Sequence, residues 1–343
     1  MKSLISSMGS LVVAVSLLCA CSGRGAGQGV RSSAGSTRET PRSRRLPRRK
    51  PPWYRDISKA KLADDSKRTI SWLASQGGGW GRGCFQIDSS MHVLTATRST
   101  PYRRFETTDD FYSPDCDHVP MPVPAGGAIE GETGYRCESD GDCHLLVFDP
   151  YRKRLYEMWR ADIRGGTFHG GCLAVWDLRR AYGPSGRGHG CTSADAAGLP
   201  IAPLLARPDA VAAGAVKHAL RFILPNPRIR RQAYVSPATH STNATSGGRY
   251  APPYGARFRL RRDFPVQTLK SKGARVLART LQRYGMFLAD AGSITLTVQS
   301  DRGARHKWEG LLGPHDLRPL KVTDFEVVAH GAVFPYDGEC ERR

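Results

Sequence analysis

The clearest periodic pattern in this chain is that of one amphipathic helix. Between residues 274 and 284, apolar side chains recur at intervals of three and four positions. The opposite side of this helix carries polar residues: Arg275, Arg279, Gln282 and Arg283. Gly285 is expected to end it, because glycine readily adopts the left-handed backbone found after helix C-termini. A shorter helix is predicted around Leu73, ended by the glycines at 77–79.

Most other apolar positions form short runs separated by turn residues, which is typical of β-strands. The predicted strands are 91–97, 144–149, 154–159, 172–177, 218–224, 234–237, 256–260, 286–290 and 294–299. Two hairpins are expected, one joining 144–149 to 154–159 and one joining 286–290 to 294–299. This pattern predicts a mainly β fold, a single sandwich or jelly-roll-like domain over residues 53–343 with two or three helices.

The N-terminus has the layout of a signal peptide. Lys2 is followed by an apolar segment at 11–18 that is too short for a good membrane span. The tetrapeptide Leu18-Cys19-Ala20-Cys21 then resembles the lipobox of bacterial lipoproteins. The resemblance implies that residues 1–20 are removed and that Cys21 is lipidated. An exported, membrane-anchored protein is therefore expected, with the outer membrane favoured in a Gram-negative cell because Ser22 is not an aspartate. An ordinary cleaved signal peptide is the alternative.

Residues 21–52 form a basic, low-complexity linker that we expect to be disordered. Residues 21–50 contain nine Lys or Arg and a single acid, Glu39, which accounts for +8 of the net charge of +20. Such a tail can attract anionic headgroups near a membrane or act only as a soluble spacer. An exported protein meets little nucleic acid, so the basic charge is a weak argument for a nucleic-acid partner.

The cysteine content agrees with export, because thiols tend to pair outside the cytosol. Seven cysteines follow Cys21: Cys84, Cys116, Cys137, Cys143, Cys172, Cys191 and Cys340. Disulfides are predicted between Cys137 and Cys143 and between Cys172 and Cys191. No Cys-x-x-Cys pair, P-loop, dinucleotide fingerprint, His-Glu-x-x-His helix or EF-hand loop occurs in the sequence. The sequence therefore predicts neither a cofactor nor a metal site.

Several phrases between residues 115 and 330 resemble those of a broad family of exported, largely unannotated bacterial proteins. The most specific is Thr-Ser-Ala-Asp-Ala-Ala-Gly-Leu-Pro at 192–200; others are Asp-Cys-His at 142–144 and Tyr-Gly-Met at 284–286. The resemblance implies one coherent exported domain and carries no activity. The chain departs from the family at Cys143, where Arg is expected, and at Ala291, where Asn is expected.

The candidate chemistry centres on the first predicted hairpin. Asp142 and His144 share one face of a strand, Glu130 precedes them, and a loop at 149–152 would place Glu157 opposite His144. Two carboxylates and a histidine on one face suit general acid–base work on a polysaccharide. The same set could hold a divalent metal, or could simply be the solvent-facing side of a hairpin.

Two further candidates are weaker. Tyr254 and Arg257 could form an aromatic and basic groove for a sugar or an acidic polymer, or could pack as ordinary surface residues. His189, Ser193 and Asp195 lie on one loop without a nucleophile elbow, so we expect Ser193 or Asp195 to cap a turn.

Two functions remain open at this stage. The first is a lipid-anchored cell-envelope protein that is a non-catalytic binding or structural module. The second is a carbohydrate-active enzyme, a glycoside hydrolase or polysaccharide lyase, that uses His144 and nearby carboxylates. Convergence of Glu130, Asp142, His144, Glu157 and Asp195 in one cleft would favour the enzyme.

The lipid anchor can be tested directly. Replacing Cys21 with alanine removes the expected acyl acceptor and should leave an unprocessed or soluble form. Membrane fractionation and the mass of the mature protein measure this. Unchanged fractionation and mass in the C21A variant would show that Cys21 is not the anchor.

Overall fold

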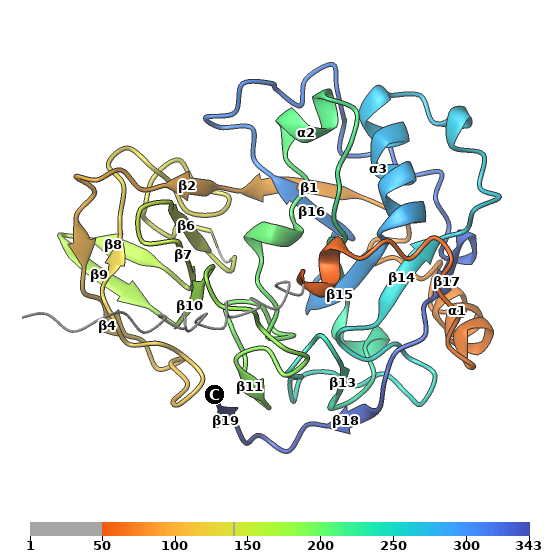
Figure 1. Ribbon diagram of the computed structural model, residues 1–343, viewed down its shortest axis with the longest axis horizontal. Coiled ribbons are helices and arrows are strands. Elements are labelled where there is room, and N and C mark those ends of the chain that lie inside the picture. The colour runs from red at the N-terminus through yellow and green to blue at the C-terminus, as the bar shows by residue number, and fades with distance from the viewer. Residues whose placement is uncertain (1–49, 140) are drawn as a thin grey trace, which may run out of the picture. The chain divides into compact units, whose positions relative to one another are not determined.

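The computed structural model describes residues 50–139 and 141–343 (Figure 1). The predicted signal peptide, the lipidation site Cys21 and the predicted linker up to residue 49 lie outside the described residues. The described residues belong to one compact unit. Within the described residues, no helix has both the length and the apolar character required to cross a membrane.

The larger of the two main sheets has six strands, of which β12 and β14 are the most deeply buried. Its order is β1-β16-β12-β15-β14-β17, with parallel pairing of β1 to β16 and of β12 to β15. The strands are β1 (Ile87–Met91), β12 (Leu220–Leu224), β14 (Arg257–Leu260), β15 (Met286–Ala291), β16 (Leu296–Gln299) and β17 (Phe325–Val327). Central strands such as β12 are nearly continuous apolar runs, as is typical of strands that are buried on most of both faces.

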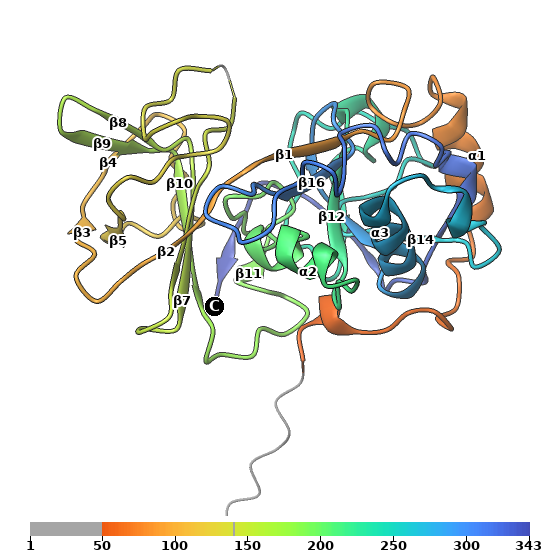
Figure 2. The ribbon, with the colours of Figure 1, turned by 90° about the horizontal axis from the view of Figure 1, so that it is seen from above.

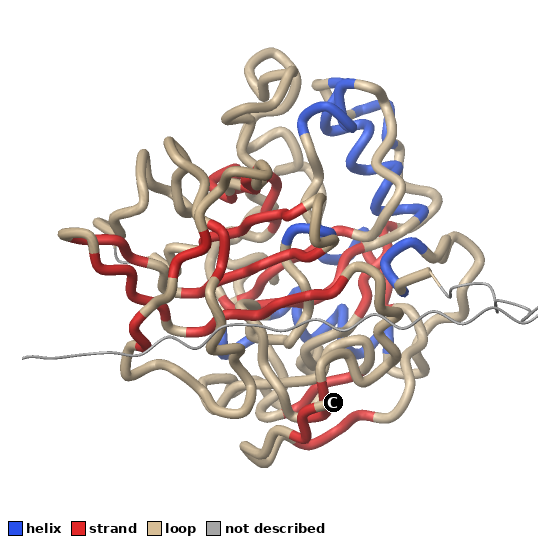
Figure 3. Tube along the Cα trace, turned by 60° about the vertical axis from the view of Figure 1, so that its left-hand side comes forward, coloured by secondary structure: helices blue, strands red, loops and turns tan. Residues whose placement is uncertain are grey.

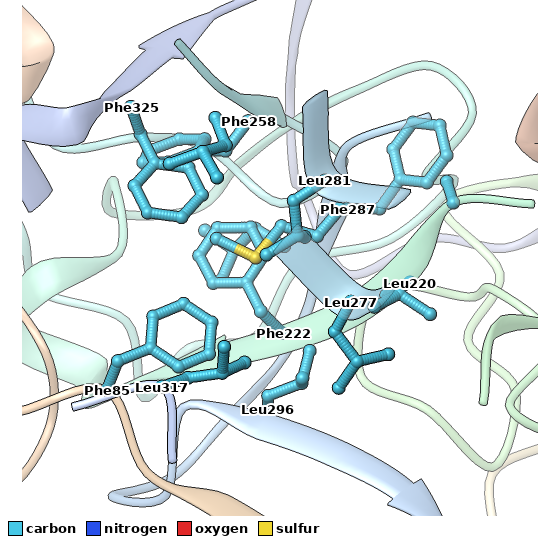
Figure 4. Packing of buried hydrophobic residues seen from close by; sticks show 14 of the residues in the cluster. Phe85, Leu220, Phe222, Phe258, Leu277, Leu281, Phe287, Leu296, Leu317 and Phe325 are labelled. Carbon is cyan, nitrogen blue, oxygen red and sulfur yellow. The ribbon is translucent and has the colours of Figure 1, made fainter. Parts of the chain in front are cut away.

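The helices cover this larger sheet. They are α1 (Ser66–Ser75), α2 (Pro208–Ala212) and α3 (Lys272–Arg283), with α3 packed on β14 and α1 on β17. The Ser271 side chain caps α3 by accepting a hydrogen bond from the Ala274 N–H at 3.1 Å. Leu277 and Leu281 of α3 pack with Phe222 and Phe258 of the sheet (Figure 4). Short 3₁₀-helices are η1 (Pro52–Tyr54), η2 (Ala202–Leu204), η3 (Asn226–Arg228), η4 (Val266–Thr268) and η5 (Val322–Asp324).

The second main sheet has four strands in the order β10-β7-β6-β2, and β2, β7 and β10 are labelled in Figure 2. This sheet has a hydrophobic core of its own. These strands are β2 (Val93–Thr95), β6 (Leu145–Asp149), β7 (Arg154–Trp159) and β10 (Cys172–Asp177). One extended segment supplies both β1 and β2, so the two main sheets share a continuous stretch of backbone from residue 87 to 95.

Four small sheets complete the domain. Their strands are β3 (Tyr102–Arg103), β4 (Glu106–Thr107), β5 (Met121–Pro122), β8 (Asp162–Arg164), β9 (Thr167–Gly170), β11 (Gly188–His189), β13 (Ala233–Val235), β18 (Val333–Pro335) and β19 (Glu341–Arg342). The prediction of a mainly β fold with two or three helices is confirmed, with several sheets and three α-helices in the described part of the chain (Figure 3).

Of the two predicted hairpins, the first is present in the structure with a different register and the second is absent. Strands β6 and β7 do pair, but Phe148 lies opposite Leu155 and not opposite Lys153, because Lys153 has a positive φ and belongs to the turn. The hairpin expected over 286–299 is wrong. Strand β12 lies between β15 and β16, where its apolar side chains complete the centre of the sheet.

Three disulfides link the described cysteines. Cys137 is bonded to Cys143, as expected, but Cys172 is bonded to Cys116 and Cys191 to Cys340. The predicted Cys172–Cys191 bond is therefore wrong. Cys172 is the first residue of β10, and the segment that follows Cys116 lies beside this strand. The Asp117 N–H donates to the Leu173 carbonyl at 2.7 Å, which brings Cys116 close to Cys172. Cys191 follows β11, whose partner β19 follows Cys340.

This bonding pattern predicts the thiol chemistry of the oxidised protein. A maleimide added to the denatured, unreduced chain should label Cys84, which is free, and none of the other six cysteines of the described residues. Peptide mapping by mass spectrometry before and after reduction measures the labelling. A peptide containing Cys172 crosslinked to Cys191 would contradict the pattern.

Candidate functional site

A hollow of about 550 Å³ opens where the first strand of the larger sheet meets the loops that precede β6. Its walls come from β1, β12, β15, the loop before β16 and the segments around residues 130 and 142. The side chains used in the argument below are Asp88, Glu130, Asp142, His144, Arg221 and Asp290. Residues 88 and 290 are separated by almost the whole domain in sequence, so this hollow exists only in the folded chain.

Strand alternation explains why charged groups from buried strands reach the hollow. On β12, Leu220 and Phe222 belong to the hydrophobic core, whereas Arg221 and Ile223 line the hollow. Asp290 lies opposite Ile223 in the parallel pairing of β12 and β15. A charged residue inside an apolar strand is therefore directed to the polar side of the sheet.

Arg221 is buried and holds together three polar groups. Its guanidinium lies 3.2 Å from Asp195 Oδ1 and 3.5 Å from Asp290 Oδ2, and it donates to Thr297 Oγ1 at 2.8 Å. Burial raises the pKa of Asp195, although Arg221 opposes the change. The pKa of Asp290 is raised well above its ordinary value, because burial and the neighbouring Asp195 carboxylate both disfavour a second negative charge.

His144 and Glu130 form a second charged pair. His144 Nδ1 donates to Glu130 Oε2 at 2.6 Å, and His144 Nε2 donates to the Ala194 carbonyl at 2.8 Å. Both ring nitrogens face acceptors, so the ring carries both protons and is an imidazolium. Burial alone would lower the pKa of His144, but the Glu130 carboxylate outweighs it and raises that pKa to about 9.

The pKa values of the carboxyl groups in the hollow are shifted in different directions. Burial would raise the pKa of Glu130, but His144 and Arg221 lower it, so Glu130 is ionised. Burial raises the pKa of Asp88 despite its hydrogen bonds from Ser90. The side chains of Glu130 and Asp290 are each 18% exposed, whereas Asp195 is fully enclosed. Glu130 and Asp290 can therefore contact a ligand, and Asp195 cannot.

Three of the four residues predicted at the hairpin do line this hollow: Glu130, Asp142 and His144. Asp142 is exposed and accepts a hydrogen bond from Trp159 Nε1 at 2.8 Å.

The prediction for Glu157 is wrong. Glu157 pairs with Leu146 rather than with the position of His144, because the true register differs by two residues. Its buried carboxylate instead accepts hydrogen bonds from the Ile201 N–H at 2.9 Å, the Ala202 N–H at 2.8 Å and Trp176 Nε1 at 2.9 Å. Burial raises its pKa, and these bonds oppose the rise. Glu157 therefore anchors a backbone segment and does not reach the hollow.

The predicted groove of Tyr254 and Arg257 is also wrong. Tyr254 is completely buried in the main core, since its strand-like segment bridges to Tyr234. The Arg257 guanidinium is used internally, because it donates to the carbonyls of Pro52, Arg55 and Tyr284 at 2.9 to 3.1 Å. Neither side chain presents a binding surface.

Asp88, Arg221 and Asp290 were not assigned to the site from the sequence. The signal for Arg221 and Asp290 was a charge inside an otherwise apolar strand, which has to be paired when it is buried. Ser193 behaves as a turn cap, as expected: its hydroxyl accepts from the Asp195 N–H at 3.0 Å and donates to the Leu199 carbonyl at 2.8 Å.

Within residues 50–139 and 141–343, one group of three potential metal ligands lies close together: Asp115, Cys191 and Cys340. Both of these cysteines are consumed by their mutual disulfide, so the group does not fit a metal ion. Comparison of the chain with protein-family models, curated proteins and solved structures gives no match.

The charged pair of His144 and Glu130 makes a spectroscopic prediction. His144 should titrate with a pKa of about 9, and Glu130→Gln should lower this pKa, because burial is then opposed only by Asp142 and the Ala194 carbonyl. NMR of protein with isotopically labelled histidine measures the titration. Glu106→Gln, which removes an exposed carboxylate elsewhere, should leave His144 unchanged.

The same pair makes the unfolding free energy depend on pH. A pKa that is higher in the folded state stabilises the fold fully below pH 6.5, and this stability is lost as the pH rises through about 9. The full contribution is roughly 3 kcal/mol, at about 1.4 kcal/mol per pKa unit. Urea unfolding at pH 6 and pH 10 should show the loss in the native protein and a smaller loss in E130Q. Equal pH dependence in both proteins would contradict the pairing.

Proposed function

We propose that this protein is a carbohydrate-active enzyme of the cell envelope, a glycoside hydrolase whose active site is the hollow between β1 and the loops before β6. The observation that carries the proposal is the pair of Glu130 and Asp290. Both carboxyl groups are partly exposed to the same hollow, and their surroundings shift their pKa values in opposite directions. An ionised and a protonated carboxyl group in one site is the arrangement that glycoside hydrolysis requires.

Each group has a definite role in the proposed reaction. Asp290 donates its proton to the glycosidic oxygen as the bond between that oxygen and the anomeric carbon breaks. Glu130 stabilises the positive charge that develops at the anomeric carbon. The oxygen of a water molecule then bonds to that carbon, and a proton of this water passes to the Asp290 carboxylate, which restores the acid. Arg221, 3.5 Å from Asp290 Oδ2, stabilises the carboxylate that remains after proton transfer. His144 is a positioning residue that keeps Glu130 ionised and fixes its orientation.

The state of His144 rules out a lyase reaction in which this histidine is the base, and leaves the ionised Glu130 as the base available to such a reaction. A lyase needs a base that removes a proton from the sugar ring, and an imidazolium with both nitrogens donating cannot accept one. The sequence-based role of His144 as an acid–base group is therefore replaced by one in which it holds Glu130.

The pairing of the two buried cations of the hollow disfavours an anionic group at its base, although the exposed Arg82 also lines the hollow. The cation of His144 is paired with Glu130, and that of Arg221 with Asp195. Neither buried cation is left over to bind a substrate carboxylate or sulfate. Hydroxyl groups, which both donate and accept hydrogen bonds, suit a wall of carboxylates.

A location in the cell envelope is part of the proposal. It rests on the lipobox-like sequence at Cys21 and on the basic segment that follows. The three disulfides support it, since such bonds persist in oxidising compartments. A lipid-anchored hydrolase would act on polysaccharide close to the membrane.

The proposal predicts that Glu130→Gln and Asp290→Asn each lower glycan cleavage by at least about 100-fold, because each removes one half of the acid–base pair. Release of reducing ends from a panel of neutral, amino and acidic polysaccharides measures the activity. The matched control is Asp177→Asn, which removes a carboxylate from the end of β10 that pairs with Arg179 outside the hollow. This control should cleave like the native protein.

Two results would overturn the proposal. One is full activity in both E130Q and D290N. The other is failure of the native protein to cleave any glycan in the panel, which would favour the non-catalytic binding or structural module that the sequence also allows.

A further inference from the structure

Strand β1 lines two hollows, one on each face. Asp88 and Ser90 face the hollow described above, whereas Ile87 and Ser89 line a second one of about 340 Å³. Alternation along the strand explains the division, since successive side chains point to opposite faces. The second hollow is completed by Val298, Trp308, Glu309, Leu312 and Pro314.

The second hollow has a rigid apolar wall and a polar rim. Trp308 is held at two points, because its Nε1 donates to the Gln299 carbonyl at 2.9 Å and its backbone N–H donates to Asp301 Oδ2 at 2.8 Å. Leu312 and Val298 continue the wall, which belongs largely to the core: Trp308 and Leu312 are 8% and 7% exposed, and Val298 is fully buried. Ser89 and Glu309 are exposed at the rim. A volume near the lower end of the range for small-molecule sites, about 300–1,000 Å³, suits a single sugar ring.

Strand β1 is also the outermost strand of the larger sheet. The two hollows therefore lie on the two sides of this one strand. The edge is covered at one end by Pro314, whose carbonyl accepts from the Ile87 N–H at 2.9 Å. Near the other end, the Gly131 N–H donates to the Ser90 carbonyl at 3.3 Å. Ser89, between these two contacts, is exposed.

We propose that the second hollow binds a further sugar unit of the same glycan chain, so that the two hollows form one binding track across β1. This inference rests on the proposed hydrolase function. A sugar ring presents an apolar C–H face that can pack on the exposed parts of Trp308 and Leu312, and hydroxyl groups that can bond to Ser89 and Glu309. Glu309 is the one ionisable side chain of the lining, which disfavours an anionic occupant.

The test is to fill the second hollow without touching the first. Ser89→Arg places a long side chain at an exposed position of its lining, and Ser99→Arg, the same change at an exposed serine that lines neither hollow, is the matched control. Kinetics are measured on a polysaccharide that the native protein cleaves and on a chromogenic aryl glycoside of the same single sugar. Ser89→Arg should raise KM for the polysaccharide at least tenfold and leave the aryl glycoside unchanged, while Ser99→Arg should behave like the native protein on both.

The outcomes separate the two proposals. If the native protein cleaves glycans and Ser89→Arg retains the native KM for the polysaccharide, the track is wrong and the hydrolase assignment stands. If Ser89→Arg impairs both substrates equally, the second hollow is no separate subsite and the track is again wrong. If the native protein cleaves neither substrate type, the hydrolase assignment is wrong and the track falls with it.

Discussion

The burial of the Arg221 guanidinium is the constraint on which much of this structure depends. A buried cation is tolerated only when carboxylates and other acceptors surround it, and removing one partner of such a pair typically costs about 3–5 kcal/mol. The partners come from different parts of the chain: Asp195 from a loop, Asp290 from β15 and Thr297 from β16. Pairing them fixes the polar face of the larger sheet and sets the protonation state of the residue proposed to donate the proton.

The segment from residue 192 to 202 connects the two main sheets through adjacent residues. The Ala194 carbonyl accepts from His144, just before β6, and the next residue, Asp195, binds Arg221 of β12. A few residues later, the N–H groups of Ile201 and Ala202 bind the buried Glu157 of β7. The charged pairs of the hollow are therefore coupled through one short piece of backbone, which gives a physical reason for the distinctive residue pattern of this segment.

The sequence pattern correctly predicted those features of the fold that depend on residues close together in the chain. The helix α3, the pairing of β6 with β7 and the Cys137–Cys143 bond each depend on residues close together in sequence. The two-residue difference in register came from the turn, where the positive φ of Lys153 cannot be read from its side chain. The insertion of β12 between β15 and β16 and the bonding of Cys191 to Cys340 are long-range events that no spacing rule specifies.

The residues of the candidate site can also be separated into those that the sequence predicted and those that it did not. Glu130, Asp142 and His144 lie within fifteen residues of one another, and their grouping in one site could be predicted from the sequence. Glu157 was misjudged because a carboxylate that binds backbone N–H groups has the same sequence signature as one that does chemistry. Asp88 and Asp290 could be assigned to the site only from the folded structure.

The Cys191–Cys340 bond spans 149 residues and encloses five of the six strands of the larger sheet. A protease that cuts an exposed loop within that span therefore releases no fragment, and the nicked pieces stay tethered at a high effective concentration that favours their reassociation.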